Sequence, residues 1–259
     1  MPEGHTVHRT ARHFQKNFVG QVVAVSSPQG RFTDAGLISG TRLLSAKAIG
    51  KQLFLNFEPA ILRIHLGIYG KWRFENFESV PEPVGLVRAR FLAGNELADL
   101  RGPTACELLD SQQLAVVEAK LGPDPLDPKA DAERFISRVL RSQTPIGQLL
   151  MDQSVIAGIG NVYRAELLFR AGINPYTPGK LLQAEQVLNL WLDAVSLMPL
   201  GVRTGLMLTR EGFLKAKTLK ADRYYVYKRE GLPCRECGGN VAIDLMATRK
   251  LYFCPNCQK

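Results

Sequence analysis

The hydrophobic period of the chain changes at a proline-rich segment, and this change most constrains the fold. Residues 121–128 read Leu-Gly-Pro-Asp-Pro-Leu-Asp-Pro, a composition that predicts an interdomain linker. Before the segment, short apolar runs alternate with turn residues, which is typical of an antiparallel β-sandwich or barrel. After it, apolar residues recur at helical spacing. We therefore expect an α+β protein with a β-rich first part and a helical second part.

A helix over residues 5–18 precedes the expected strands. Val7, Ala11 and Phe14 recur at helical spacing, and Gly20 ends the helix. The expected strands are Val22–Val25, Leu43–Ile49, Leu53–Phe57, Ile61–Leu66, Trp72–Phe74, Val87–Leu92 and Leu97–Leu100. The expected later helices are Ala132–Arg141, Ile146–Met151, Val162–Ala171 and Ala184–Leu197, followed by a basic loop over Arg210–Arg223.

The charge of the chain favours a polyanionic partner. The sequence has 33 Lys+Arg against 24 Asp+Glu, a net charge of +9. Nucleic acid is the first candidate, an anionic membrane surface the second, and a merely basic soluble protein the alternative. Residues 210–259 hold 11 basic and 5 acidic residues, so 11 − 5 = +6 of the charge lies there. With no apolar run of about 18 residues and no secretory signal, we expect a cytoplasmic protein without a membrane span.

Four of the five cysteines form two close pairs near the end of the chain. Cys234-Pro-Arg-Cys237 is followed, after 16 residues, by Cys254-Pro-Asn-Cys257. This spacing predicts one tetrahedral Zn²⁺ per chain, with redox chemistry of the Cys-x-x-Cys pairs as the alternative. Zinc held by four cysteines has no open position, so it would be structural. It would hold a hairpin of two strands, Val241–Leu245 and Lys250–Phe253, too small to fold by burial alone.

A Gly-Ile-Gly turn at residues 158–160 precedes the expected helix that Asn161 caps. Glycines allow a phosphate to approach the backbone, and the free N–H groups of a helix start attract anions. A tight helix–helix connection is the alternative interpretation.

The N-terminus offers a nucleophile. Removal of Met1 would leave Pro2 with a terminal secondary amine, whose reference pKa of about 7.7–8.0 allows attack at neutral pH. Such an amine can attack a sugar C1′ and form an iminium ion, with Glu3 moving protons. A Met-Pro-Glu start without any role is the alternative.

These motifs occur together and in this order in one known family. The chain resembles the formamidopyrimidine-DNA glycosylase/endonuclease VIII family over essentially its whole length. The Glu-Gly-His-Thr opening and the Ser-Ser-Pro-Gln-Gly-Arg-Phe stretch at residues 26–32 look most like actinobacterial endonuclease VIII. The resemblance implies an N-terminal helix with an antiparallel β-sandwich, a helix–two-turns–helix domain and a zinc-finger hairpin. We assign these to residues 2–120, 129–220 and 225–259.

The resemblance also implies catalytic roles. Pro2 matches the Schiff-base nucleophile, and Glu3 matches the general acid that assists opening of the sugar ring. Lys51, in the turn Ile49–Leu53, matches a lysine that contacts the DNA backbone beside the lesion. An exposed hairpin lysine is the alternative for Lys51. The implied reaction excises an oxidised base and removes the sugar by β,δ-elimination.

Five further residues match DNA-binding positions of the family. Asn161 matches a phosphate-binding asparagine, and Arg249 an arginine that grips phosphates around the flipped nucleotide. His65 lies near the loop whose Ile68 and Tyr69 would fill the void left by that nucleotide. The alternatives are a solvated turn for Arg249, a core or strand-end histidine for His65, and strand-end core for Ile68 and Tyr69.

Departures from the family pattern bear on the substrate. Thr6 stands where many members have a glutamate, and residues 99–106 replace the Asp-Pro-Arg-Arg-Phe segment of the formamidopyrimidine branch. The differences favour oxidised pyrimidines, such as thymine glycol and 5-hydroxyuracil, over 8-oxoguanine. We expect a monomer acting on damaged DNA and associated with the nucleoid when bound. The alternatives are an oxidised-purine enzyme of the same family, a non-catalytic zinc protein that binds DNA, and a nuclease or ligase fragment.

Overall fold

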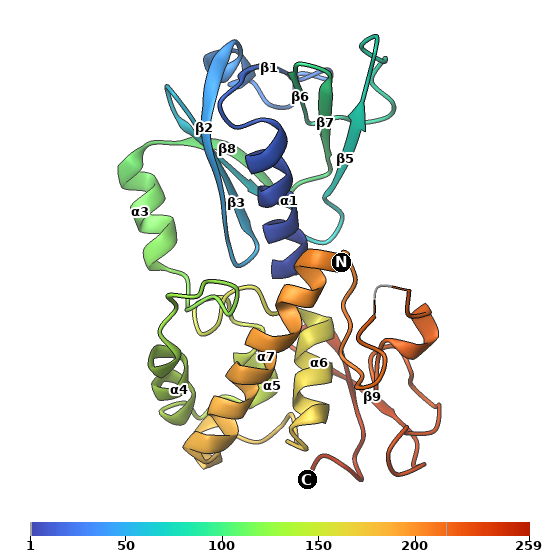
Figure 1. The fold of residues 1–259 in the computed structure, drawn as a ribbon. Coiled ribbons are helices and arrows are strands. Elements are labelled where there is room, and N and C mark those ends of the chain that lie inside the picture. The colour runs from blue at the N-terminus through green and yellow to red at the C-terminus, as the bar shows by residue number, and fades with distance from the viewer. Residues whose placement is uncertain (1, 216) are drawn as a thin grey trace. The chain divides into compact units, whose positions relative to one another are not determined.

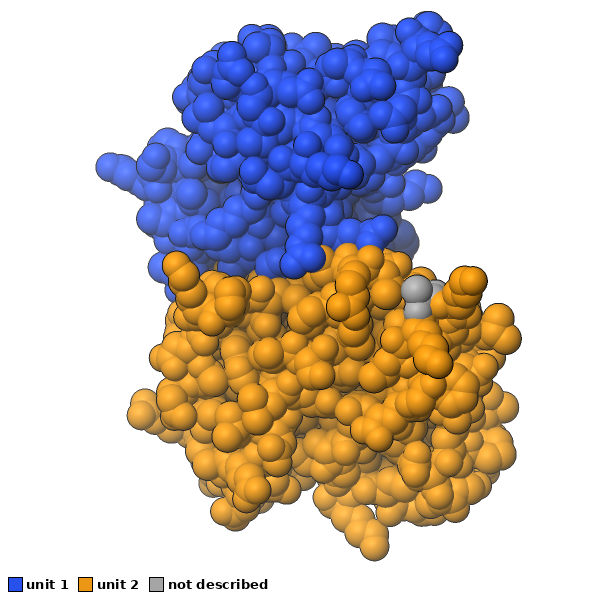
Figure 2. All heavy atoms as spheres, viewed as in Figure 1, with its two compact units in different colours: residues 1–120 blue, residues 121–259 orange. Residues whose placement is uncertain are grey.

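The computed structural model describes residues 2–215 and 217–259 and contains two compact units, Met1–Lys120 and Leu121–Lys259 (Figures 1 and 2). Each unit has a hydrophobic core of its own. The boundary coincides with the start of the proline-rich segment, where the sequence predicts the change from strands to helices. The described residues contain no helix that is long and apolar enough to cross a membrane.

The first unit combines a helix with one antiparallel sheet. Helix α1 (Gly4–Asn17) is followed by eight strands in the spatial order β5-β7-β6-β1-β2-β3-β4-β8 (Figure 1). The strands are β1 (Val22–Ser26), β2 (Thr41–Ile49), β3 (Gln52–Phe57), β4 (Ile61–His65), β5 (Lys71–Asn76), β6 (Ala89–Ala93), β7 (Glu96–Arg101) and β8 (Ala105–Leu109).

Strand β1 changes partner along its length. Val22 and Val23 pair with β2, whereas residues 24–26 pair with β6. The sheet is thereby divided into two halves, and both contribute to one hydrophobic core. This arrangement confirms the predicted antiparallel sandwich. The short helices α2 (Ala35–Ile38) and α3 (Ser111–Ala119) and strand β8 were not predicted from the sequence.

Helix α1 is fixed to the sheet by aromatic side chains. Phe14 is fully buried, and its ring lies 5.0 Å from Trp72, 5.7 Å from Phe74 and 5.9 Å from Phe91 between centroids. Truncating a buried phenylalanine of this kind costs about 3–5 kcal/mol. Because Pro2 and Glu3 immediately precede α1, the packing of Phe14 also fixes the N-terminal residues relative to the strands.

The proline-rich segment predicted to link two domains begins at the boundary between the units and belongs to the second unit. Residues 121–125 are buried within the second unit. The Gly122 amide donates to the Gln153 carbonyl at 2.8 Å, and the Ala157 amide donates to the Pro123 carbonyl at 2.9 Å. Hydrogen bonds through the Gly122 amide and the Pro123 carbonyl therefore join the segment to the second unit.

The second unit is mainly helical. It contains α4 (Ala132–Leu140), α5 (Ile146–Leu149), α6 (Asn161–Arg170) and α7 (Ala184–Thr204), with 3₁₀ turns η1 (Gly179–Leu181) and η2 (Lys220–Asp222). Helix α7 continues beyond the predicted end at Leu197 and includes Pro199. Met198 and Val202 are buried in the core, so tertiary packing outweighs the helix-breaking tendency of proline. Gly205, with φ 75°, ends the helix in a left-handed cap.

A two-stranded hairpin completes the second unit. Strands β9 (Ala242–Met246) and β10 (Arg249–Phe253) pair antiparallel, and Ala247 and Thr248 form the turn with φ 49° and 63°. Both central residues of this turn type need positive φ, which asparagine and glycine adopt readily and a β-branched residue resists. The hairpin shares a hydrophobic cluster with α6. The division of residues 129–259 into two domains stays a prediction.

Candidate active site and metal centre

Pro2 and Glu3 lie at the start of α1. Glu3 is the N-cap residue in extended conformation, and its carbonyl accepts the Thr6 amide at 2.9 Å. Its side chain is fully buried, while Pro2 is partly exposed. A carboxyl group is thus held beside the residue predicted to carry the nucleophilic amine. The predicted removal of Met1 concerns a position outside the described residues.

The first turn of α1 also holds a buried histidine that the sequence analysis did not assign. His5 is 3% exposed, and burial, reinforced by the nearby charge of Arg9, lowers its pKa to about 4. The Thr6 hydroxyl lies 3.2 Å from the imidazole Nε2. His5 is therefore neutral at pH 7, two residues from Glu3.

Lys51 and His65 come together at one end of the sheet. Lys51 lies in the turn that joins β2 to β3, and His65, the last residue of β4, pairs in register with Gln52. Burial, followed by the positive charges of Arg63 and Lys51, lowers the pKa of His65. His65 is thus a half-buried histidine at the end of a strand, which agrees with the alternative interpretation given above. It also lies beside Lys51.

The loop between β4 and β5 presents two apolar side chains. A Cβ on Gly67 would lie 1.9 Å from the Thr104 hydroxyl, and one on Gly70 would lie 2.2 Å from the Leu66 carbonyl. Both positions therefore need glycine for a loop this tight. Ile68 is 39% exposed and Tyr69 is 84% exposed. Exposure of this extent excludes the interpretation of Tyr69 as strand-end core.

Asn161 does not cap α6, and that prediction is wrong. Gly160 is the N-cap residue and Asn161 the first helical residue. The Asn161 side chain turns to the hairpin, where its Nδ2 donates to the Lys250 carbonyl at 2.9 Å. A side-chain amide can hydrogen-bond either to the start of its own helix or to the backbone of another segment. The sequence alone does not show that the hairpin lies next to Asn161 in the fold.

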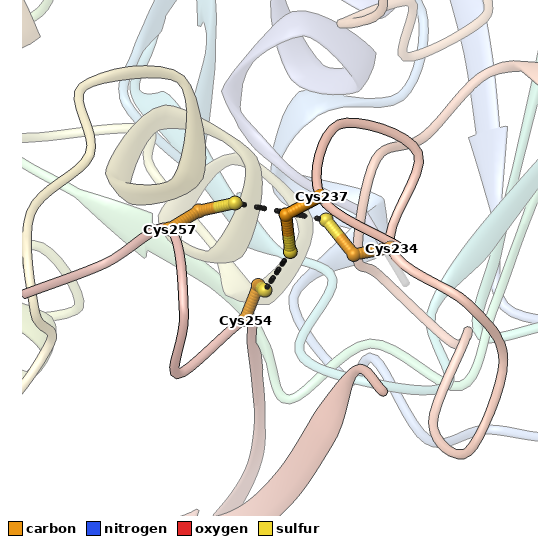
Figure 3. Close-up of side chains that lie close together, drawn as sticks. All are labelled: Cys234, Cys237, Cys254 and Cys257. Atoms are coloured by element: carbon orange, nitrogen blue, oxygen red, sulfur yellow. Dashed lines mark hydrogen bonds between the residues drawn. The ribbon is translucent and has the colours of Figure 1, made fainter. Parts of the chain in front are cut away.

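The four predicted metal ligands converge on one point (Figure 3). The sulfur atoms of Cys234, Cys237, Cys254 and Cys257 all lie within 4.8 Å of one another. The Cys234–Cys257 and Cys237–Cys254 sulfur distances are 3.9 and 3.5 Å. Tetrahedral zinc with Zn–S bonds of about 2.3 Å requires sulfurs about 3.8 Å apart. The cysteine geometry therefore fits a tetrahedral metal ion.

The fifth cysteine, Cys106, lies outside the cluster. Burial raises the pKa of its thiol to about 12, so it is unreactive. Gln258, which follows the second pair, is buried; its Oε1 accepts the Cys254 amide at 2.8 Å and its Nε2 donates to the Ile173 carbonyl at 2.9 Å. This link between the metal centre and the helical part was not predicted from the sequence.

Arg249 lies directly after the hairpin turn. No residue in 2–215 or 217–259 forms a hydrogen bond or ion pair with its guanidinium group. Arg249 is thus a cation available to an anionic ligand. Arg249 is partly exposed, and arginine suits phosphate in geometry and charge.

Glu166 in α6 is a second residue that the sequence analysis missed. Its carboxylate is fully buried and accepts the amides of Tyr225, Val226 and Tyr227 at 2.7–2.9 Å, with the Thr209 hydroxyl at 2.7 Å. Burial raises the pKa of Glu166. The sequence did contain a sign of this site, a glutamate within the apolar run of α6, because a buried charge requires hydrogen-bond or charged partners.

Two family models match most of the chain. The formamidopyrimidine-DNA glycosylase N-terminal domain matches residues 1–106, and the H2TH domain of the same enzymes matches residues 121–211. Among curated relatives, endonuclease 8 1 of Mycobacterium tuberculosis is 45% identical, with 100% of both chains covered. The formamidopyrimidine-DNA glycosylase of Thermus thermophilus is 30% identical, covering 100% of this chain and 98% of its own.

Solved structures have the same fold. Lactococcus lactis Fpg in complex with abasic-site DNA superposes with a TM-score of 0.82 at 22% identity, covering 99% of each chain. The matched family models and the names of the curated relatives define the class as DNA-repair glycosylases. The chain belongs to the formamidopyrimidine-DNA glycosylase/endonuclease VIII family, whose members are DNA glycosylases and AP lyases.

Proposed function

We propose that this protein excises oxidised bases from DNA through a Schiff base at Pro2 and then cleaves the strand. The Pro2 nitrogen would bond to C1′ as the bond from C1′ to the base breaks. Glu3 would protonate the sugar-ring oxygen, so that the ring opens and an iminium ion forms. Loss of the 3′ and then the 5′ phosphate would leave a one-nucleotide gap. The burial of the Glu3 carboxyl beside Pro2 is the observation that carries this proposal.

The proposed DNA contacts belong to both units. In the first unit, Lys51 and His65 would contact the backbone near the lesion, and Ile68 and Tyr69 would fill the vacated stack. In the second unit, Arg249 and the start of α6 at Asn161 would hold phosphates. The exposure of Tyr69, and an Arg249 guanidinium without a partner in residues 2–215 and 217–259, support these roles. We propose that the protein acts as a monomer in the cytoplasm, associated with the nucleoid when bound to DNA.

Zinc is the metal that best fits the four cysteines. Four thiolates at tetrahedral spacing suit zinc in a structural role. Bound zinc would hold the two ends of the β9–β10 hairpin together and thereby support Arg249. Because all four ligands come from the protein, the metal would take no part in the chemistry.

Borohydride trapping on duplex DNA with one 5-hydroxyuracil tests the nucleophile. We expect a covalent adduct at residue 2 of the mature protein and a much weaker one with Pro2→Gly, whose terminal primary amine can still form a reducible imine, while Pro2→Gly and Glu3→Gln still bind the duplex. An adduct that peptide mapping places at a residue other than residue 2 would identify a different nucleophile. Protein that retains Met1 serves as a second control, because its proline nitrogen is an amide and cannot form the iminium ion.

Oxidised pyrimidines are the proposed substrates, and the endonuclease 8 name of the relative at 45% identity supports them. The rival class is oxidised purines, which the formamidopyrimidine-DNA glycosylase name of the relatives near 30% identity favours. Excision rates for 5-hydroxyuracil and 8-oxoguanine in otherwise identical duplexes decide between them. Faster release of 8-oxoguanine would reject the pyrimidine preference and leave the Schiff-base chemistry intact.

A further inference from the structure

One backbone carbonyl of the hairpin is bound by two side chains of α6. Asn161 Nδ2 donates to the Lys250 carbonyl at 2.9 Å, and Arg164 Nη2 donates to the same oxygen at 3.0 Å. Arg164 Nη2 also donates to the Asn161 Oδ1 at 2.5 Å, which closes a ring of three hydrogen bonds. Both side chains are buried, Arg164 completely.

This ring fixes strand β10 to the start of α6. In a two-stranded ribbon, part of the backbone carbonyls point away from the partner strand and need other donors. The Lys250 carbonyl receives a charged donor from Arg164, and hydrogen bonds to charged groups are about twice as strong as neutral ones. The residue that follows Arg249 is therefore held at its own carbonyl, apart from the cysteines, which lie at the opposite end of the hairpin.

The residue on the other side of Arg249 is also constrained. Thr248 has φ 63° and Ala247 has φ 49°, a left-handed conformation that residues with a side chain seldom adopt and that persists only where the surroundings impose it. Arg249 thus lies between a strained turn and a buried hydrogen-bonded carbonyl. Its backbone position is determined on both sides, while its guanidinium has no partner among the described residues.

We infer that Arg164 is a positioning residue that aligns Arg249 with the N-terminus of α6, so that the two form one preformed phosphate-binding unit. The inference rests on the proposed function, in which Arg249 and the α6 start hold DNA phosphates. Arg164 itself is fully buried and acts through Arg249. Preorganisation of this kind raises affinity by removing the cost of ordering the cation at the time of binding.

A double-mutant cycle on Arg164 and Arg249 tests the inference. The ligand is duplex DNA with a tetrahydrofuran abasic-site analogue, and binding is measured by fluorescence anisotropy at several salt concentrations. We expect Arg164→Met to weaken binding by about tenfold, the loss of roughly one charged hydrogen bond. In an Arg249→Ala background the same change should weaken binding less than about twofold. Both single variants should reduce the salt slope by about one, and the double variant should reduce it no further.

Tyr176→Phe is the matched control. The Tyr176 hydroxyl hydrogen-bonds Asp244 on β9, so it also joins the helical part to the hairpin, but on the strand without Arg249. We expect Tyr176→Phe to change DNA affinity by less than about twofold. Arg164→Lys, which keeps the charge but not the planar fork, should lie between wild type and Arg164→Met.

The outcomes separate this inference from the proposed function. Equal losses from Arg164→Met with and without Arg249 would overturn the coupling and leave the proposed function standing. If Arg249→Ala binds as tightly as wild type, the phosphate contact itself fails and the coupling fails with it. Loss of zinc or of the folded state in both Arg164→Met and Arg164→Lys would also overturn the inference, since Arg164 would then be purely structural.

Discussion

Replacing Glu166 by glutamine exchanges one carboxylate oxygen for an NH₂ group in a site where every neighbour is a donor. Oε1 accepts Val226 and Tyr227, and Oε2 accepts Tyr225 and the Thr209 hydroxyl. With NH₂ at Oε2, the hydroxyl can still donate to the Arg223 carbonyl, 3.0 Å away. The Tyr225 amide has no such alternative and would lose its acceptor.

The size of the effect follows from these bonds. One orphaned buried donor costs about 1–3 kcal/mol, and exchanging a charged acceptor for a neutral one in the remaining bonds costs about 1 kcal/mol more. We therefore expect Glu166→Gln to lower the free energy of unfolding by about 2–4 kcal/mol. For a protein of this size the thermal midpoint should fall by about 4–16 °C.

Denaturation and amide hydrogen exchange test this prediction together. Urea unfolding gives the stability loss, and exchange should accelerate locally at the amides of Tyr225, Val226 and Tyr227. Glu230→Gln is the isosteric control, because Glu230 is exposed and should change stability by less than about 0.5 kcal/mol. A Glu166→Gln protein within about 0.5 kcal/mol of wild type, with unchanged exchange at 225–227, would refute the reasoning.

Three further predictions concern other buried or coordinated groups. Folding lowers the pKa of His5 from 6.5 to about 4, so the unfolded chain binds the proton at a higher pH than the folded protein does. The free energy of unfolding should therefore fall by about 3 kcal/mol as the pH is lowered from 6.5 to 4. Urea unfolding of His5→Gln should lack this loss. Arg90 and Asp99 form a buried bidentate pair at 2.8 and 3.0 Å, so Arg90→Met should lower the free energy of unfolding by about 3–5 kcal/mol. Adding Asp99→Leu should restore part of this stability, because it removes the unpaired buried carboxylate. A double variant no more stable than Arg90→Met would contradict this explanation. A chelator should release one zinc per chain and increase hydrogen exchange across residues 234–257, while exchange in residues 4–119 stays unchanged; equal acceleration in both units would contradict a local role for the metal.

The sequence predicted those parts of the fold that local patterns determine. Apolar spacing located α1 and seven of the eight strands of the sheet, and cysteine spacing located the metal centre. Such patterns depend on residues close in the chain. Strand β8 was missed because Ala105–Leu109 alternates weakly, and its pairing with β4 connects residues about 40 apart.

The errors and omissions at the site involve contacts between distant segments. Asn161 has the residue type of a cap, but Lys250 competes for its side chain from 89 residues away. Glu166 and Arg164 are charged residues within an apolar helix, and the sequence does not specify the backbone groups that neutralise or bind them. Long-range partners of this kind arise from the tertiary fold rather than from local propensity.

The burial of residues 121–125 has a practical consequence for dividing the protein. A fragment of the second unit that starts at residue 129, where the predicted helical domain begins, would leave out the Gly122 amide and the Pro123 carbonyl, which hydrogen-bond to Gln153 and Ala157. The segment from Gln153 to Ala157 leads directly into Gly160 and α6. Truncation at residue 129 would therefore disturb the helix start that we propose to bind phosphate, whereas a cut between Lys120 and Leu121 should preserve it.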